Sequence, residues 1–352
     1  MTAAGISVFR IADGKGVESW TSTDPSPTEE ELRWLTEVGR WTRSGDTPST
    51  ERDTSPPMIW EVLTHNLTWR FQVAEARERE RIDQELRVAR EIQEALLPEV
   101  MPKLEGCEMT AYYQPAREVG SDFYDFLVLE DRRLGLVVSD ATGKGIPAAV
   151  MMATTRGMLR AVVQSVEPPG QVLGRITEAL AADIPPSTLV SCFYGVLDPQ
   201  SGRRVYANAG HNLPCRRRHG GQADELRARG MPLGVMPGTA YEEKEVVLDS
   251  GDSALFYSDG LVEAHDPRRK MFGFPRLRRL VAEHDSEEGS LVEFLMDKVR
   301  SFTGEGWEQE DDFTLLTLER TTSPYSTVTV SGVASEQRGA ETGRTYTLLD
   351  TS

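Results

Sequence analysis

The stretch from Val119 to Pro147 constrains the fold more than any other part of this chain. It reads VGSDFYDFLVLEDRRLGLVVSDATGKGIP, with acidic signatures at Gly120–Asp125 and Ser139–Gly145. Each signature stands at one end of an apolar run, and the polar residues Glu130–Arg133 join the two runs. Runs rich in Tyr, Phe and Val around a polar turn predict a β-hairpin. This hairpin would bring aspartate carboxylates from both signatures to one place.

The composition excludes several classes of protein. The chain has 352 residues, enough for one catalytic domain with extensions. Its formal net charge of -17 argues against a protein that wraps nucleic acid or lies on an anionic membrane. No stretch approaches the roughly 20 apolar residues of a membrane helix, and the N-terminus lacks the pattern of a secretory signal. We therefore expect a cytoplasmic protein whose three cysteines are thiols.

Two segments precede the main domain. Residues 1–57 form a short N-terminal segment, read as a sensory remnant or a regulatory region, with a strand expected at Ile6–Ile11 and a helix at Thr28–Arg43. Residues 58–98 lack Gly and contain Pro only at their end, so they predict one long helix. A narrow seam of this helix favours a parallel coiled coil and a homodimer; the alternative is a helix lying on its own domain. The seam consists of Ile82, Leu86, Ala89, Gln93 and Leu96.

The main domain is predicted to span residues 104–319. Its β-rich segments include few strand-helix-strand alternations, which predicts an α+β fold of antiparallel sheets covered by helices. Strands are expected at 107–114, 122–129, 134–139, 189–198, 203–208, 213–217, 241–248, 253–257 and 313–318, and helices at 146–164, 170–183, 276–283 and 290–302. Residues 320–352 are Ser/Thr/Gly-rich and predict a disordered tail.

Carboxylates recur at turns that follow apolar runs in the main domain. A hard divalent cation such as Mn²⁺ or Mg²⁺ prefers oxygen ligands, so aspartates converging from several strands are what a two-metal hydrolase requires. A single Asp in a turn is commonplace, and only the set carries weight. The set comprises Asp122, Asp125, Asp140, Asp259, Asp311 and Asp312.

The sequence offers little support for other catalysts. Gly143–Gly145 lacks the upstream glycine and the Lys-Ser/Thr pair of a Walker A loop. Neither a Gly-x-Ser-x-Gly elbow nor metal-ligand spacing of histidines is present. His211, in the sequence Asn208–Asn212, would either orient substrate or cap a turn.

Six ordered motifs resemble the PPM-type metal-dependent serine/threonine phosphatases, and in particular their bacterial SpoIIE-like branch. The helical segment REIQEALLP that ends at Pro98 is also similar to that branch. The motifs span roughly 200 residues, and their order makes the resemblance specific, whereas each motif alone is weak. They are VGSDFYD (119–125), DATGKGIPAA (140–149), YANAGHNLP (206–214), PLGV (232–235), YSDGLVEA (257–264) and DDFTLL (311–316).

The resemblance implies a four-layer α-β-β-α sandwich with two Mn²⁺ or Mg²⁺ ions at one end. Asp140 would bridge both metals, assisted by the carbonyl of Ala141, while Asp259 and Asp311 would complete one site and Asp122 would serve the other. Asp312 is the less favoured of the final pair, and Asp125 would support the ligands. Arg117 is placed like the family's phosphate-holding arginine. Thr142 stands where eukaryotic relatives carry a histidine proposed as general acid.

The resemblance also implies a function. Water activated by the two cations would hydrolyse phosphoserine or phosphothreonine, with an anti-sigma-factor antagonist in a partner-switching stress-response pathway as the expected substrate and partner. The seam would then transmit a dimer rearrangement toward Asp140. Two alternatives stay open: a non-catalytic dimeric regulator that binds a partner, and a phosphatase acting on a small phosphorylated metabolite.

Overall fold

A computed structural model describes most of the chain. The described residues are 6–12, 15–22, 58–98, 100–102, 104, 106–129, 133–166, 168–183, 188–199, 201–285, 289–321, 328–333 and 343–347. The chain divides into two compact units, Met1–Leu86 and Arg87–Ser352. Among the described helices, none is long and apolar enough to cross a membrane.

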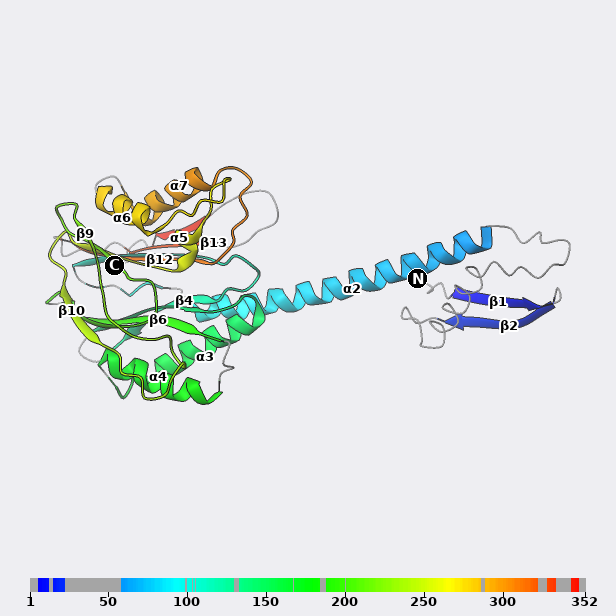
Figure 1. Cartoon of the computed structure of the whole chain (residues 1–352), viewed down its shortest axis with the longest axis horizontal. Helices are drawn as coiled ribbons and strands as arrows, with labels where there is room; N and C mark the ends of the chain where they lie inside the picture. The colour runs from blue at the N-terminus through cyan, green and yellow to red at the C-terminus, as the bar shows by residue number, and fades with distance from the viewer. Residues whose placement is uncertain are drawn as a thin grey trace. The chain divides into compact units, whose positions relative to one another are not determined.

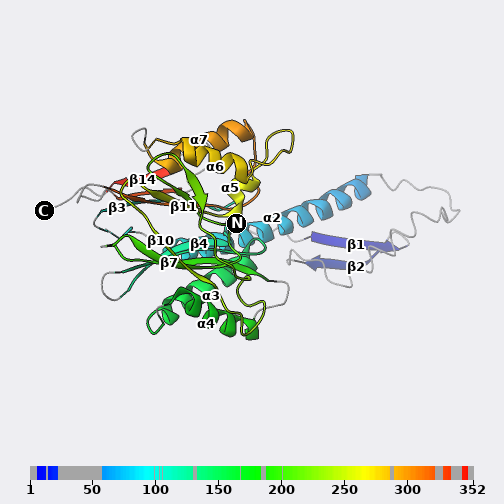
Figure 2. The same ribbon diagram turned by 60° about the vertical axis from the view of Figure 1, so that its left-hand side comes forward.

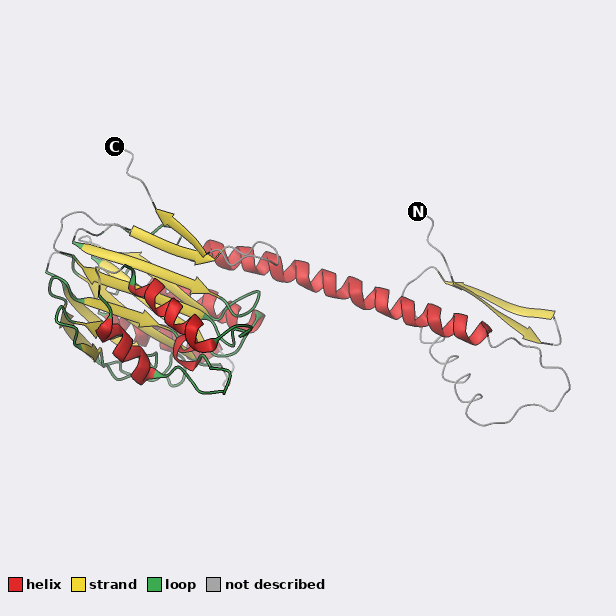
Figure 3. Ribbon diagram, turned by 90° about the horizontal axis from the view of Figure 1, so that it is seen from above, coloured by secondary structure: helices red, strands yellow, loops and turns green. Residues whose placement is uncertain are grey.

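The first unit contains a hairpin and most of a long helix. Strands β1 (Ile6–Ala12) and β2 (Lys15–Ser22) pair in antiparallel register. Only the first strand was predicted, although the intervening residues Asp13 and Gly14 are a pair that favours two-residue hairpin turns. Helix α2 (Met58–Leu96) begins in this unit and ends in the second, as predicted for residues 58–98 (Figure 3). The helix expected at Thr28–Arg43 lies outside the described residues.

The second unit contains two stacked sheets. The five-stranded sheet has the order β10-β7-β6-β5-β4 and is antiparallel throughout. Figure 1 shows helices α3 and α4 lying along its outer face. The bounds are β4 (Asp122–Val128), β5 (Leu134–Ala141), α3 (Ile146–Val162), α4 (Pro169–Asp183), β6 (Val190–Leu197), β7 (Arg203–Ala209) and β10 (Glu243–Val247).

The seven-stranded sheet has the order β14-β13-β3-β12-β11-β8-β9. Helices α6 and α7 lie on its outer face (Figure 2). The bounds are β3 (Cys107–Gln114), β8 (Cys215–Arg217), β9 (Ala223–Glu225), β11 (Ser253–Tyr257), α5 (Asp259–Glu263), α6 (Phe274–Glu283), α7 (Leu291–Thr303), β12 (Phe313–Arg320), β13 (Val328–Val333) and β14 (Gly343–Thr347).

Three apolar clusters hold these layers together. One fills the space between the sheets, one lies between the five-stranded sheet and its helices, and one lies between the seven-stranded sheet and its helices. Phe193 of β6 packs on Phe256 of β11 with ring centroids 5.1 Å apart, which joins the sheets directly. Each fully buried side chain of this size contributes about 1.5–3 kcal/mol. The predicted α-β-β-α sandwich is confirmed.

Strand alternation decides which carboxylates reach the space between the sheets. In β4, Tyr124 and Phe126 face the cluster between the sheets, whereas Phe123 and Leu127 face helices α3 and α4. Because side chains alternate along a strand, Asp122 points between the sheets and Asp125 points toward the helices. The two acidic residues of one short motif therefore have different surroundings.

Two parts of the structure differ from the predictions. The prediction of a disordered tail at 320–352 misses the end of β12, together with β13 and β14; β13 pairs in parallel with β3, and β14 pairs with β13. The segment VTVSGV in β13 is rich in β-branched valine and threonine, which suits the open edge of β3. The seam residue Gln93 is buried in the second unit against its own domain, so it does not face a second helix.

Candidate active site

Two aspartates face each other where the predicted hairpin ends. Asp122 is the first residue of β4 and Asp140 the next to last of β5, and the two are Cα partners in the antiparallel register. Asp122 is buried, and the charge of Asp140 acts on its carboxyl group. The hairpin therefore brings these two aspartates together at one end, as predicted.

Hydrogen bonds from the second sheet fix Asp122 from the opposite side. Thr314 of β12 donates its Oγ1 hydrogen to Asp122 Oδ2 over 2.7 Å. The backbone N–H of Thr314 donates to Ser258 Oγ, and Ser258 Oγ donates to the carbonyl of Asp312, both over 3.0 Å. This chain of bonds connects the ends of β4, β11 and β12. It makes the carboxylate geometry depend on the separation of the two sheets.

Asp259 adds a third carboxylate from the end of β11, as the first residue of the short helix α5. Burial, followed by repulsion from Asp140 and Asp311, raises the pKa of Asp259 to about 7. Burial also raises the pKa of Asp140 to about 6, with Asp311 and Asp312 adding to the effect. Burial and the charge of Asp140 raise the pKa of Asp122 well above its usual range. These carboxylates therefore repel one another and favour a positive charge between them.

The adjacent residues Asp311 and Asp312 have different roles. Asp312 is buried, and its carboxylate accepts hydrogen bonds from the backbone N–H groups of Ala116 (2.7 Å) and Ser121 (2.5 Å), and from Ser121 Oγ. It therefore holds the loop between β3 and β4. Asp311 is half-buried and lies near the other aspartates of the site, since its charge raises the pKa values of Asp140 and Asp259. This supports the earlier preference for Asp311 as the ligand.

Glycines allow the close approach of these elements. A Cβ atom on Gly120 would lie 2.7 Å from Asp312 Oδ2, and one on Gly260 would lie 2.2 Å from the carbonyl oxygen of Asp312. Real Cβ atoms do not make such contacts, so position 260, which faces backbone, requires glycine, and a larger residue at position 120 would displace the Asp312 carboxylate.

Asp125 lies on the other face of β4 and binds helix α3. Arg160 donates to it from Nε over 2.7 Å and from a terminal nitrogen over 2.8 Å, and the Nε of Arg156 lies 3.1 Å away. Its carboxylate therefore ties the helix to the sheet and lies apart from the group around Asp140. The support of the ligands expected of Asp125 stays a prediction, because its carboxylate pairs with α3 on the opposite face of the strand that carries Asp122.

The end of β5 leads into an anchored turn. Ala141 is buried, and its N–H donates to the carbonyl of Ser121 over 3.2 Å. Thr142 exchanges two bonds with Leu189: its N–H donates to the Leu189 carbonyl, and its Oγ1 accepts from the Leu189 N–H, both over 2.8 Å. The Thr142 hydroxyl is thus engaged in fixing this turn.

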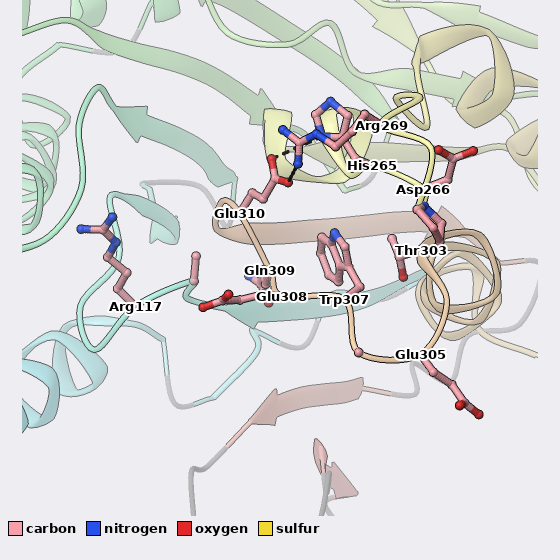
Figure 4. A pocket seen from close by; sticks show the side chains of 13 residues that line it. Arg117, His265, Asp266, Arg269, Thr303, Glu305, Trp307, Glu308, Gln309 and Glu310 are labelled. Carbon is pink, nitrogen blue, oxygen red and sulfur yellow. Dashed lines mark hydrogen bonds and ion pairs between the residues drawn. The ribbon is translucent and has the colours of Figure 1, made fainter.

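Arg117 is exposed on the loop after β3, on the wall of a pocket of about 580 Å³. Glu310 also lines this pocket and pairs with Arg269 and His265 (Figure 4). The pocket therefore adjoins Asp311 through its neighbour Glu310. This position is compatible with the expected contact between Arg117 and a substrate phosphate.

His211 is placed inside the protein. Its Nδ1 lies 2.8 Å from Ser191 Oγ, and its backbone exchanges two hydrogen bonds with the Asn208 side chain. Burial lowers the pKa of His211 to about 4, so the ring is neutral at pH 7. Of the two roles considered for this histidine, the geometry supports the stabilisation of a turn.

The donor set suits a hard divalent cation. Asp122, Asp140, Asp259 and Asp311 offer carboxylate oxygens, which Mn²⁺ and Mg²⁺ prefer. A positively charged side chain already lies beside these carboxylates: Lys144 Nζ is 3.1 Å from Asp311 Oδ2. Among the described residues, no three His, Cys, Asp or Glu side chains are close enough to enclose an ion as they stand.

Sequence reasoning missed the uncharged side chains that position the carboxylates. Ser258 and Thr314 stand next to the acidic motifs in YSDGLVEA and DDFTLL, but ordinary strand residues give no signal of a bond across two sheets. Gln93 was assigned to the helix seam. Its polarity within an apolar seam was the one available sign of a buried partner.

Comparison with known proteins agrees with this geometry. The family profile described as Stage II sporulation protein E (SpoIIE) matches residues 130–321, more than half of the chain. The phosphoserine phosphatase RsbU of Bacillus subtilis (strain 168) is 28% identical over 247 residues, covering 68% of this chain and 71% of RsbU. Protein IcfG of Synechocystis sp. is 27% identical over 266 residues, covering 67% of this chain and 41% of IcfG. The chain thus spans less than half the length of IcfG.

Solved structures share the fold. The RsbU and RsbW domains of Rv1364c from Mycobacterium tuberculosis superpose with a TM-score of 0.53 at 28% identity, covering 65% of this chain and 64% of that one. The SiaA-PP2C domain of Pseudomonas aeruginosa gives a TM-score of 0.60 at 23% identity, covering 69% of this chain and 98% of that domain. The second unit therefore has the PP2C-type phosphatase fold, and the chain belongs to the SpoIIE family.

Proposed function

We propose that this protein is a metal-dependent serine/threonine protein phosphatase that uses two Mn²⁺ or Mg²⁺ ions. The observation that carries the proposal is the convergence of Asp122, Asp140, Asp259 and Asp311 at one end of the sandwich, with pKa values raised at three of them. Membership of a family with phosphatase relatives supports the same reaction.

The chain's own residues would hold and orient the reacting groups. When bound, the cations would lower the pKa of water and neutralise charge on the phosphoryl group. Asp140, between the two sheets, would hold both ions with the carbonyl of Ala141, while Asp259 and Asp311 would complete one site and Asp122 the other. Thr314 and Asp312 would keep this arrangement by fixing Asp122 and the loop beside it.

Arg117 would bind the substrate phosphate from the adjoining pocket, since a guanidinium forms strong paired bonds with phosphate oxygens. The leaving oxygen would take its proton from water, because threonine, which stands at position 142, is not among the side chains that serve as general acids. No covalent phosphoenzyme is required.

The proposed substrate is a phosphorylated anti-sigma-factor antagonist in a partner-switching stress-response pathway. The similarity to RsbU and to a structure containing RsbU and RsbW domains supports this choice. The kinase that phosphorylates the antagonist would then be a separate protein.

A homodimer through helix α2 is part of the proposal. Val88 and Ile92 are apolar, lie four residues apart, and are 51% and 60% exposed. Residues at this spacing share one face of a helix. Light scattering would measure a dimer, and Ile92→Glu would be expected to yield a monomer.

The catalytic proposal is tested by hydrolysis of p-nitrophenyl phosphate with and without Mn²⁺. We expect Mn²⁺-dependent activity that Asp140→Asn reduces at least about 100-fold, consistent with loss of a group that stabilises charge in the transition state. Asp297→Asn is the matched control, because this carboxylate is 76% exposed on α7. Activity that is independent of Mn²⁺ and unchanged in Asp140→Asn would refute the metal mechanism.

The substrate is tested separately with a phosphorylated anti-sigma-factor antagonist, followed by mass spectrometry. Loss of one phosphate from the antagonist, at rates well above those for small phosphorylated metabolites, is the expected result. The reverse preference would favour a metabolite phosphatase. Tight binding without dephosphorylation of either would favour the non-catalytic regulator.

A further inference from the structure

A Gly-Lys-Gly loop lies between two anchored points at the mouth of the site. Thr142 is fixed by its two bonds to Leu189, and helix α3 begins at Ile146. Between them, Gly143 and Gly145 have φ values of 102° and 76°, a region that favours glycine. A Cβ atom at either glycine would meet nothing within 4 Å. The loop is therefore exposed, and Lys144 is its only side chain.

Lys144 reaches from the five-stranded sheet to the seven-stranded sheet. Its ammonium group lies 3.1 Å from Asp311 Oδ2 and donates a hydrogen bond to the carbonyl of Glu310. Asp311 and Glu310 stand just before β12, whereas Lys144 follows β5. The side chains of Lys144 and Asp311 are 35% and 31% exposed, so this ion pair is accessible to solvent.

The surrounding charges explain why the ammonium group stands there. The Asp311 carboxylate repels Asp140 and Asp259, and Lys144 relieves part of this negative charge. The neighbouring carboxylate of Glu310 pairs with two other side chains. Arg269 Nη1 lies 2.5 Å from Glu310 Oε1, and His265 Nδ1 lies 3.3 Å from Glu310 Oε2. Arg269 and His265 therefore contact Glu310, and Lys144 is the side chain paired with Asp311.

We propose that Lys144 is an internal counter-ion that competes with the divalent cation for Asp311. This inference rests on the proposed function, since Asp311 is a ligand in that proposal. A carboxylate oxygen binds Mg²⁺ at about 2.1 Å, and an ammonium group at hydrogen-bond distance from the same carboxylate would repel the ion. Lys144 must withdraw before Asp311 can bind the cation, and its two flanking glycines leave room for that movement.

The competition has a consequence for the protein without cation. Lys144 reduces the repulsion among the carboxylates, and it raises the concentration of cation at which Asp311 is occupied. The residue is thus a determinant of metal affinity rather than a ligand or a catalytic residue.

Isothermal titration of the full chain with MnCl₂ tests the proposal without any measurement of activity. Lys144→Met is expected to bind Mn²⁺ about 30-fold more tightly, the effect of removing one unit charge about 4 Å from a doubly charged ion in a water-exposed setting. Lys144→Arg keeps the charge and should retain the wild-type affinity. Lys244→Met is the matched control, because Lys244 pairs with Glu242 at 2.7 Å and is similarly exposed, at 48%.

The outcomes separate this inference from the proposed function. If the wild-type chain does not bind Mn²⁺, the proposed function fails. If it binds Mn²⁺ and Lys144→Met binds equally or more weakly, the competition is refuted while the phosphatase proposal stands. Circular dichroism of each variant checks folding, which the exposed loop position should leave intact.

Discussion

The side chain of Gln93 forms a pair of hydrogen bonds with the backbone of Gly120. Gln93 Nε2 donates to the Gly120 carbonyl over 2.7 Å, and the Gly120 N–H donates to Gln93 Oε1 over 2.8 Å. Gly120 is followed by Ser121, which binds Asp312, and by Asp122 itself. The last turns of helix α2 are therefore bonded directly to the loop that carries the site.

Replacing Gln93 by leucine should lower both stability and activity. The substitution leaves the buried N–H and carbonyl of Gly120 without partners, which costs about 1–3 kcal/mol for each unsatisfied group. Displacement of the loop beside Asp122 should lower kcat at least about tenfold. Urea unfolding and p-nitrophenyl phosphate kinetics at saturating Mn²⁺ measure the two effects. Gln84→Leu, at an exposed position of the same helix, is the control. Wild-type kinetics in Gln93→Leu would disprove the positioning role.

Alanine substitutions at Asp311 and Asp312 should separate binding from stability. Asp312→Ala removes an acceptor used by Ala116 and Ser121, and it should lower the free energy of unfolding by about 2–4 kcal/mol. Asp311→Ala should abolish Mn²⁺-dependent hydrolysis, yet change the stability of the metal-free protein by less than about 1 kcal/mol. Chemical denaturation and activity assays of both variants distinguish them. The reverse assignment of effects would identify Asp312 as the ligand.

The stability of the metal-free protein should depend on pH through Asp259. Its pKa is raised from 3.8 to about 7, so the folded state binds the proton more tightly than the unfolded chain. This contribution to stability is present below the unfolded value and is lost as the pH rises through about 7. At pH 7.5, the free energy of unfolding of Asp259→Asn should therefore exceed that of the wild type by about 1–3 kcal/mol. Urea unfolding measures this difference.

The difference in the free energy of unfolding between Asp259→Asn and the wild type isolates the effect of Asp259 from that of other titrating groups. His211 contributes in the opposite direction, because its lowered pKa makes stability rise with pH up to about 6.5. The advantage of Asp259→Asn should shrink between pH 7.5 and pH 5. Saturating Mn²⁺ should reverse it, because the wild type gains a ligand that the variant lacks. An advantage that is the same at both pH values would contradict the raised pKa.

Asp125→Asn should destabilise the attachment of helix α3. The carboxylate is almost fully buried and pairs with Arg156 and Arg160, so its removal leaves two cations without their partner. Breaking such a buried pair costs about 3–5 kcal/mol, whereas Asp297→Asn, which breaks an exposed pair with Arg300, should cost less than about 1 kcal/mol. Equal unfolding midpoints for the two variants would rule out this role.

Local patterns were sufficient for most elements of the second unit. The strand at Cys107–Gln114 follows from residue composition, the helix that begins at Ile146 follows from its first-turn proline, and the hairpin of β4 and β5 follows from two apolar runs around a polar turn. Helix α5 was missed because it has only five residues, too few to show helical periodicity. Asp122 and Asp311 could be assigned to one site only through the family resemblance, because they are far apart in sequence.

Strand β13 has a consequence for the behaviour of the protein at high concentration. Its parallel pairing covers the backbone of β3 from Met109 to Tyr113. Without it, β3 would present a row of free N–H and C=O groups, which can recruit strands from other molecules. Strand β13 would then prevent self-association through the edge of β3. Protein ending at Thr321 should aggregate at concentrations at which the full chain stays dispersed.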